Sequence, residues 1–361
     1  MKDYLSVKSG PQEFICGVGV WQILTEELTK RQLKKVLVLH GQASWEVAKK
    51  YFPMDSTVEF VFYDYRKKCT DENIAYFEGI ATAQKVDGIL AVGGGKVSDL
   101  AKGVAFKLLL PVIMLPTLAS TCAAYTPLSV IYDEEGSLKR MDYYNRGIAL
   151  TLVAPEVILD SPKELLVAGI GDTLAKWYEA DAIINHRRNL PLEVEVAHFA
   201  AKKCQHVLLA KGREAVEALE KQTLNKAFVD VIETIIMVAG MVGGFGDEYG
   251  RSSGAHSIHD ALTYLPESSK QLHGKKVAYG ILVQLLIQGK WDELEELIPF
   301  YEELGLPTSL HELGLDLTIE EVELVSQKTA EIGEPIHFMK EEITPEVVSE
   351  AIYGLEKFRA G

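Results

Sequence analysis

The chain has 361 residues, of which 47% are hydrophobic and 25% charged, and its 37 Lys and Arg against 52 Asp and Glu give a formal net charge of −15. This length and composition suit a globular protein of two domains and exclude disordered, collagen-like and coiled-coil classes. Because nucleic acids and anionic membranes are bound by clustered cations, we expect neither as a partner. Four scattered cysteines and an N-terminus without an apolar segment predict a cytoplasmic protein.

The first 160 residues alternate short apolar runs with stretches of helical spacing. The expected strands are residues 36–39, 58–62, 88–92 and 112–115, and the expected helices between them are residues 44–51 and 71–85. Continuous apolar runs of this length are typical of parallel strands that are buried on both faces. The alternation therefore predicts an α/β domain with a doubly wound parallel sheet over residues 1–160.

A charge-free stretch over residues 108–132 is long enough to cross a bilayer. It contains three prolines and five hydroxyl side chains, which would leave polar groups unpaired in lipid. We therefore expect two buried segments on either side of a hydroxyl-rich loop, and no membrane span.

From residue 161 onward the sequence shows helical patterns and no convincing strand. Ser161 and Glu164 enclose a proline in the pattern of a capping box at a helix start. Thr318 and Thr344 begin two further helix-start patterns. The sequence thus predicts an all-α domain over residues 161–361.

Two loops after predicted strands suit a dinucleotide. Gly93, Gly94 and Gly95 open a helix, and glycines there let backbone N–H groups approach a diphosphate. The second loop, residues 116–121, is rich in hydroxyls and follows the next strand. Because parallel strands end at one edge of the sheet, both loops are expected on that edge, although either alone equally suits a simple connecting turn. His40 follows the first strand, where a carboxylate usually holds the NAD ribose, so NADP remains open beside NAD.

Four residues of the second half are candidate metal ligands. His256 and His259 lie on one face of a predicted helix, while Asp172 and His273 belong to other segments. A carboxylate and two imidazoles from separate helices suit Zn²⁺ or Fe²⁺. Each histidine alone equally suits a capping or core role. The histidines without comparable neighbours, which we expect to be structural, are His186, His198, His206, His311 and His337.

Five ordered motifs resemble the glycerol dehydrogenase-like branch of the iron-containing (group III) alcohol dehydrogenases. They are Gly93-Gly-Gly-Lys96, Pro116-Thr-Leu-Ala-Ser-Thr121, Gly169-Ile-Gly-Asp172, His256-Ser-Ile-His259 and Leu272-His-Gly274. The resemblance implies an NAD(P)-dependent oxidoreductase that acts on CH–OH groups and forms homo-oligomers. It implies a dinucleotide-binding domain at residues 1–160 and a helical metal-binding domain at residues 161–361, with Asp172, His256 and His273 as metal ligands. The cofactor contacts that it implies are Gly94, Gly95, Lys96, Val97, Ser98, Asp99, Thr117, Leu118, Ala119, Ser120, Thr126, Leu128 and Tyr132, to which we add His40.

Three departures from the glycerol dehydrogenase pattern concern the substrate. Cys122 replaces the aspartate that binds the polyol in those enzymes, and a thiol does not accept two hydrogen bonds from a diol as a carboxylate does. Lys176 stands one helical turn after Asp172, and Arg251 precedes His256 by five residues. A lost aspartate and two cations fit a substrate carboxylate, and the surrounding segments resemble the hydroxycarboxylate dehydrogenase subgroup. Lys176 equally suits a salt bridge to Asp172, and Arg251 a surface cation.

Several readings stay open at this point. The leading one is a metal-dependent dehydrogenase for 2-hydroxy and 2-oxo acids, with a glycerol dehydrogenase as its alternative. A lyase resembling dehydroquinate synthase would need more cations near the motifs, and a redox-sensing binding protein would not need an intact ligand set. His259 suits either a proton relay to solvent or a structural role. We expect zinc rather than iron, although the motif itself does not distinguish them.

Overall fold

The computed structural model describes residues 5–360 and divides the chain into two compact units. The sheet unit contains Lys8–Pro162 and Ala218–Gly240. The helical unit consists mainly of Lys163–Glu217 and Met241–Gly361. Residues 218–240 thus pack with the sheet unit, and the domain division expected at residues 160 and 161 stays a prediction.

The sheet unit is built on six parallel strands. They are β1 (Phe14–Cys16), β2 (Lys35–His40), β3 (Glu59–Asp64), β4 (Gly88–Gly93), β5 (Val112–Pro116) and β8 (Leu150–Val153). Their order is β1-β8-β5-β4-β2-β3, so the chain goes from β2 to a neighbour on one side and then returns to β4 on the other. The doubly wound parallel sheet is confirmed, and its switch point lies between the ends of β2 and β4. The four expected strands are present, while β1 and β8 were not anticipated.

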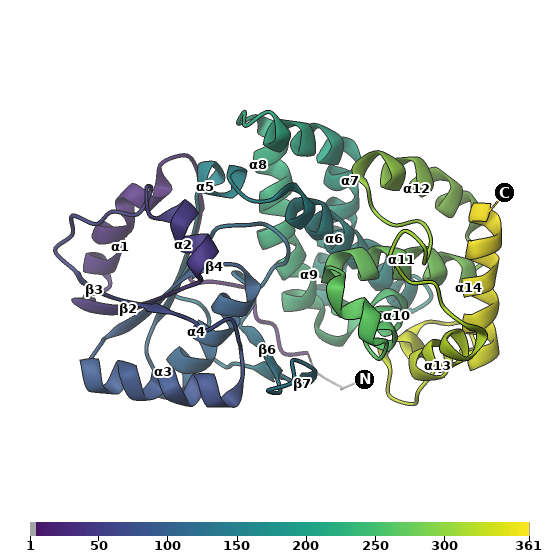
Figure 1. Ribbon diagram of the computed structural model, residues 1–361, viewed down its shortest axis with the longest axis horizontal. Helices are drawn as coiled ribbons and strands as arrows, with labels where there is room; N and C mark the ends of the chain where they lie inside the picture. Colours follow the sequence, from purple (N-terminus) through teal and green to yellow (C-terminus); the bar gives the residue numbers. More distant parts are fainter. Residues whose placement is uncertain (1–4, 361) are drawn as a thin grey trace. The chain divides into compact units, whose positions relative to one another are not determined.

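Helices cover both faces of this sheet. They are η1 (Val20–Ile23), α1 (Leu24–Lys30), α2 (Gln42–Ala48), α3 (Asp71–Gln84), α4 (Gly95–Leu108), α5 (Pro155–Leu159) and α8 (Lys226–Glu233). Figure 1 shows α1 and α2 over one face and α3 and α4 over the other. Because side chains alternate along a strand, Val36 and Val38 of β2 pack into the same apolar core as Leu24 and Leu28 of α1.

The hydroxyl-rich loop runs from β5 to an antiparallel hairpin of β6 (Leu128–Tyr132) and β7 (Leu138–Tyr143). This confirms that residues 108–132 form two buried segments around a loop. The ammonium of Lys102 on α4, which is 3% exposed, donates to the carbonyls of Ala123 at 2.8 Å and Thr126 at 3.1 Å. It also forms an ion pair of 2.8 Å with Asp99, whose other oxygen accepts from the Val130 N–H at 3.1 Å. Lys102 therefore fastens the loop and the hairpin to α4.

The helical unit has no strand among its described residues, as the sequence predicts. Its helices, with those that adjoin it, are α6 (Lys163–Ile184), α7 (Leu192–Glu220), η2 (Thr234–Val238, a π-helical turn), α9 (Ala239–Gly246), η3 (Asp247–Tyr249), α10 (Gly254–Leu262), η4 (Pro266–Lys270), α11 (His273–Ile287), α12 (Trp291–Leu304), α13 (Ile319–Thr329), η5 (Pro335–Phe338) and α14 (Pro345–Ala360). The capping box of Thr318 and Glu321 is confirmed. The one expected at Ser161 is wrong, because α6 begins only at Lys163 and the Ser161 hydroxyl has no hydrogen-bond partner.

One helical stretch, Lys226–Tyr249, is long and apolar enough by composition to cross a membrane. More than half of its most apolar window, 56%, is buried within the protein, as in the core helix of a globular fold.

We predict that Lys102→Met strongly destabilises the sheet unit. The substitution leaves the carboxylate of Asp99 buried without its cation, which costs about 3–5 kcal/mol. Lys68, which pairs with Glu134 on the surface, provides the control variant Lys68→Met, and we expect it to leave the melting temperature almost unchanged. Thermal unfolding of the two variants checks this, and equal melting temperatures would contradict the role given to Lys102.

Candidate metal centre and dinucleotide loops

Three ligand atoms converge in the helical unit. Asp172 lies within α6, His256 in the first turn of α10, and His273 is the first residue of α11. Their ligand atoms all lie within 4.8 Å of one another. Nε2 of His273 is 3.2 Å and Nε2 of His256 is 3.5 Å from the same oxygen, Oδ1 of Asp172. The structure therefore brings together the three residues that the sequence predicts as ligands.

Two glycines allow α6 and α11 to approach at this place. A Cβ on Gly274 would lie 1.9 Å from the carbonyl oxygen of Ala168, and one on Gly171 would lie 2.7 Å from the carbonyl oxygen of Gly274. Only glycine fits in such a backbone-to-backbone contact. Since Gly171 precedes Asp172 and Gly274 follows His273, the contact sets the separation of these two ligands.

The charges of the site are tightly coupled. Burial alone would raise the pKa of Asp172, but the rings of His256 and His273 hold it well below its usual range. Burial would lower the pKa of His256, but the carboxylates of Glu179 and Asp172 raise it to about 10. Without a metal, His256 therefore carries a proton between two carboxylates, and a divalent cation that binds there has to displace a proton.

A chain of hydrogen bonds leads away from His273. Its Nδ1 lies 2.8 Å from Nε2 of His259, and Nδ1 of His259 lies 2.8 Å from Oδ1 of Asp260. Burial and the neighbouring His273 lower the pKa of His259 to about 3, so this ring is neutral. The Asp260 carboxylate accepts from Nδ1 of His259, whose Nε2 then accepts from Nδ1–H of His273. Nε2 of His273 lies 3.2 Å from Oδ1 of Asp172 and is the nitrogen of this ring that faces the other two ligands.

The donor set fits a divalent transition metal. One carboxylate oxygen and two imidazole Nε2 atoms are ordinary ligands of Zn²⁺ and Fe²⁺. Both imidazoles have their second nitrogen engaged by an acceptor, which fixes the tautomer in protein metal sites. Three protein ligands leave coordination positions for water or substrate.

The two cations predicted to meet a substrate carboxylate already have partners. The Lys176 ammonium donates to the carbonyl of Arg251 at 3.1 Å. The Arg251 guanidinium donates through Nε and Nη2 to Oδ1 of Asp247, at 3.0 and 2.7 Å. Asp247 lies four residues before Arg251, so this pair of opposite charges was visible in the sequence but was missed.

The sequence analysis also missed Glu179, which lies seven residues after Asp172 on α6. It is 2% exposed and accepts hydrogen bonds from the backbone and the ring of His256. Seven residues make about two helical turns and place both carboxylates on one face of α6. This spacing was the available signal.

The two dinucleotide loops are in contact within the sheet unit. Gly93 ends β4 with φ +152°, and Gly94 and Gly95 open α4. The Thr117 N–H donates to the carbonyl of Gly93 at 3.2 Å, and a Cβ on Gly94 would meet the side chain of Leu118 at 3.1 Å. A small pocket between the loops is lined by Gly93, Gly94, Gly95, Ser98, Pro116, Leu118, Thr121, Ala123 and Ala124. It lies at the carboxyl ends of the strands, where open α/β sheets bind ligands.

The other expected cofactor residues occupy varied surroundings. Two of them are in contact: the Lys96 ammonium lies 5.4 Å from the ring centroid of Tyr132. His40 ends β2 beside the switch point, and its ring lies 4.9 Å from that of Trp45. The side chains of Ser98 and Asp99 are buried, Ser98 bonded to the Gly94 carbonyl and Asp99 to Lys102. Their contact with a cofactor stays a prediction, as it does for Val97, Ala119, Ser120, Thr126 and Leu128.

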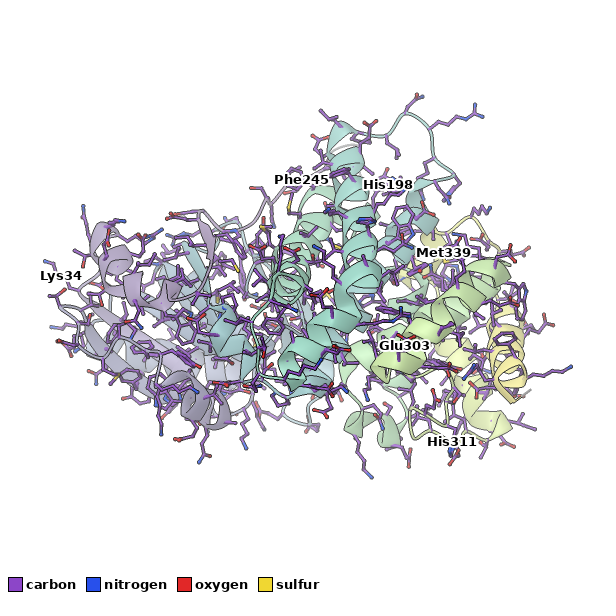
Figure 2. All side chains as sticks on the ribbon, turned by 90° about the horizontal axis from the view of Figure 1, so that it is seen from above. Lys34, His198, Phe245, Glu303, His311 and Met339 are labelled. Carbon is purple, nitrogen blue, oxygen red and sulfur yellow. The ribbon has the colours of Figure 1, made fainter. Side chains whose placement is uncertain are left out.

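A second cavity and two further histidines lie away from the metal centre and the glycine loop. A cavity of about 490 Å³ lies at the opposite edge of the sheet, beside the start of β5 and β8, and none of its lining residues comes from the glycine loop. His198 and His311, labelled in Figure 2, pair with Asp181 and Asp316.

Comparison with known proteins agrees with this arrangement. The family model for iron-containing alcohol dehydrogenases matches residues 11–157. Hydroxycarboxylate dehydrogenase A of Escherichia coli K12 is 36% identical over 99% of both chains, and the glycerol dehydrogenase of Thermotoga maritima is 33% identical over 96% of both. The chain belongs to the iron-containing alcohol dehydrogenase family. In three dimensions it is similar to a probable glycerol dehydrogenase from Sinorhizobium meliloti 1021, with a TM-score of 0.87, 30% identity and coverage of 98% of this chain and 99% of that one.

Membership of this family makes the protein an oxidoreductase that acts on alcohol groups. The family is one of NAD-dependent, metal-containing dehydrogenases, and Asp172, His256 and His273 form a group suited to a metal. The expected resemblance to glycerol dehydrogenase-like proteins is therefore confirmed.

We predict that Asp172→Ala, His256→Ala and His273→Ala each abolish zinc binding and turnover by this dehydrogenase. Each variant removes one of three ligands from the metal centre. Asp172 is buried, His256 half-buried and His273 exposed, and alanine adds no bulk at any of the three positions, so the fold should persist. Metal analysis after dialysis, with far-ultraviolet circular dichroism for the fold, checks this. Stoichiometric zinc in any of the three would overturn the ligand assignment.

We predict that Gly95→Ala weakens the binding of NADH and NADPH about tenfold or more. The added Cβ would keep the diphosphate away from the backbone N–H groups, and one lost charge-assisted hydrogen bond costs this much affinity. A Cβ at this position meets Thr121 Oγ1 at 3.4 Å and Ala123 Cβ at 3.6 Å, ordinary contacts that leave the fold intact. The control is Gly79→Ala on α3, where a Cβ meets nothing within 4 Å. Fluorescence titration measures both, and wild-type affinity in Gly95→Ala would place the diphosphate elsewhere.

Proposed function

We propose that this dehydrogenase interconverts a small 2-hydroxy acid and its 2-oxo acid by hydride transfer, with NAD or NADP and a divalent metal, for which zinc is our first choice and iron the alternative. The supporting observation is the neutral thiol of Cys122 at the position where glycerol dehydrogenases carry the polyol-binding aspartate. The similarity to a hydroxycarboxylate dehydrogenase over 99% of the chain supports the same substrate class. We propose a cytoplasmic location, with which four cysteines that form no disulfide among the described residues are in keeping, and, from the family resemblance, a homo-oligomer.

The residues of the chain would share the work as follows. When bound, the metal acts as a Lewis acid on the substrate oxygen, and the dinucleotide supplies or accepts the hydride. Asp172, His256 and His273 would hold the metal, and the hydroxyl loop and glycine loop would hold the dinucleotide. No side-chain nucleophile is required.

Proton transfer has a path within the helical unit. His259 connects His273 to Asp260, whose side chain is 41% exposed and thus reaches solvent. We propose that His259 fixes the tautomer of His273 and also relays the alcohol proton towards water: its Nε2 would take up that proton while its Nδ1–H passes to the Asp260 carboxylate.

Lys176 is the stronger candidate for binding the substrate carboxylate. Its ammonium accompanies Asp172 on one face of α6, and its charge acts on the carboxylates of both Asp172 and Glu179. Arg251 has its fork engaged by Asp247, so an acid would have to displace that carboxylate first. A hydrogen bond from Lys176 to the substrate carboxylate would replace the one that it now donates to the carbonyl of Arg251.

We predict that metal-reconstituted wild-type protein reduces pyruvate and other 2-oxo acids far better than it oxidises glycerol. Lys176→Met should lower kcat/KM for 2-oxo acids about 10- to 100-fold, the effect of one lost charged hydrogen bond, and should leave hydroxyacetone nearly unaffected. Cys122→Asp should shift the preference towards vicinal diols, by repelling the acid and binding the diol. Steady-state rates with NADH and NADPH measure all of these, with metal content determined for each variant.

A glycerol dehydrogenase is the second candidate function, favoured by the similarity to the Thermotoga maritima and Sinorhizobium meliloti proteins. A wild-type preference for glycerol would establish it in place of the first. The same would follow if Lys176→Met affected the acid and the neutral ketone equally.

A further inference from the structure

Glu179 occupies an unusual position beside the metal centre. It is a carboxylate on α6, 2% exposed, in the interior of the helical unit. A buried carboxylate is costly unless hydrogen bonds and opposite charge compensate it. All of the bonds that the structure gives to Glu179 come from one short segment, the residues that begin α10.

One oxygen of Glu179 caps this helix. Oε1 accepts from the backbone N–H of Ser253 at 2.7 Å and of His256 at 2.9 Å. The first N–H groups of a helix lack partners within it, and Ser253 itself makes no side-chain cap here. The cap therefore comes from a different helix, and its negative charge lies at the positive end of α10.

The other oxygen of Glu179 meets the imidazole of a metal ligand. Oε2 lies 2.7 Å from Nδ1 of His256, whose Nε2 faces Oδ1 of Asp172. Oε1 already accepts from two backbone N–H groups, and Oε2 at 2.7 Å is the acceptor that faces Nδ1 of His256. Nδ1 therefore carries the ring proton, and Nε2 is the nitrogen left to bind a metal.

We propose that Glu179 is a positioning residue of the metal centre, which fixes both the tautomer of His256 and the place of its backbone at the start of α10. This inference rests on the metal centre of the proposed function and is independent of the substrate. It assigns separate tasks to the two oxygens: Oε1 holds the main chain and Oε2 directs the ring.

Glu179→Gln separates the two tasks. The amide oxygen of glutamine still accepts from the two backbone N–H groups, while its NH₂ group now faces Nδ1 of His256. An NH₂ group donates, so Nδ1 has to accept and the ring proton moves to Nε2, where the metal should bind. A role limited to capping would survive this substitution, whereas a role in directing the ring would not.

The experiment measures the zinc affinity of the full-length protein by competition with a chromogenic chelator. We expect Glu179→Gln to bind zinc about 10- to 100-fold more weakly than wild type and Glu179→Asp, which keeps the carboxylate, to recover part of the loss. The matched control is Glu356→Gln, another carboxylate of the helical unit that accepts from a backbone N–H, that of Leu310, and from a side chain, the hydroxyl of Tyr279. It should bind zinc as wild type does.

A second measurement uses the unaltered protein and thus does not depend on the folding of a variant. In zinc-loaded protein with ¹⁵N-labelled histidine, nuclear magnetic resonance should show Nε2 coordination and a protonated Nδ1 for His256. Coordination through Nδ1 would overturn the proposal.

The remaining outcomes are distinct. Wild-type zinc affinity in Glu179→Gln, or an equal loss in Glu356→Gln, overturns the positioning role and leaves the proposed function standing. A wild-type protein that binds neither zinc nor ferrous iron overturns both. A preference for glycerol with weakened zinc in Glu179→Gln overturns only the proposed substrate.

Discussion

Two carboxylates buried on one face of α6 dominate the helical unit. Asp172 and Glu179 would each cost several kcal/mol in the interior if nothing compensated their charge. The compensation comes from the His256 ring that bridges them, from the N-terminus of α10 and from the charge of Lys176. The need to neutralise these groups therefore gathers the starts of α10 and α11 around α6, and a metal ion serves the same need with two positive charges.

Both units have glycines at a helix start that allow another group to come close to the main chain. In each, a helix start lies next to a glycine that removes a Cβ: Gly94 and Gly95 before the body of α4, and Gly274 in the first turn of α11. In the sheet unit the space would admit the backbone approach of the diphosphate that we predict there. In the helical unit it admits another helix, which carries a ligand with it. Lys102 and Glu179 are both buried and both bonded to main-chain groups: Lys102 holds the hydroxyl-rich loop on α4, and Glu179 holds the start of α10.

Much of this was readable from the sequence, and the failures have physical causes. The strands β2, β4 and β5 are apolar runs between turn residues, so their place and direction were predictable, as were the two loops at their ends. β8 was missed because it is only four residues long with Thr151 among them, and β1 because three residues carry no pattern. The metal ligands could be named from motifs, but the role of Glu179 depends on where α10 begins in space. Ser161 failed as a cap because the helix starts later than its side chain can reach.

The contact between Gly171 and Gly274 has a consequence for how an ion enters the site. Main-chain atoms have no rotamers, so α6 and α11 cannot slide past each other at this point without a collision. Asp172 and His273 are the neighbours of these glycines, so the contact fixes the backbone positions from which their side chains reach a metal. Ion uptake would then require protons to leave and water to be shed, with the adjustment made by the side chains. The backbone contact between the two helices therefore limits the radius of the ions that the site can accept.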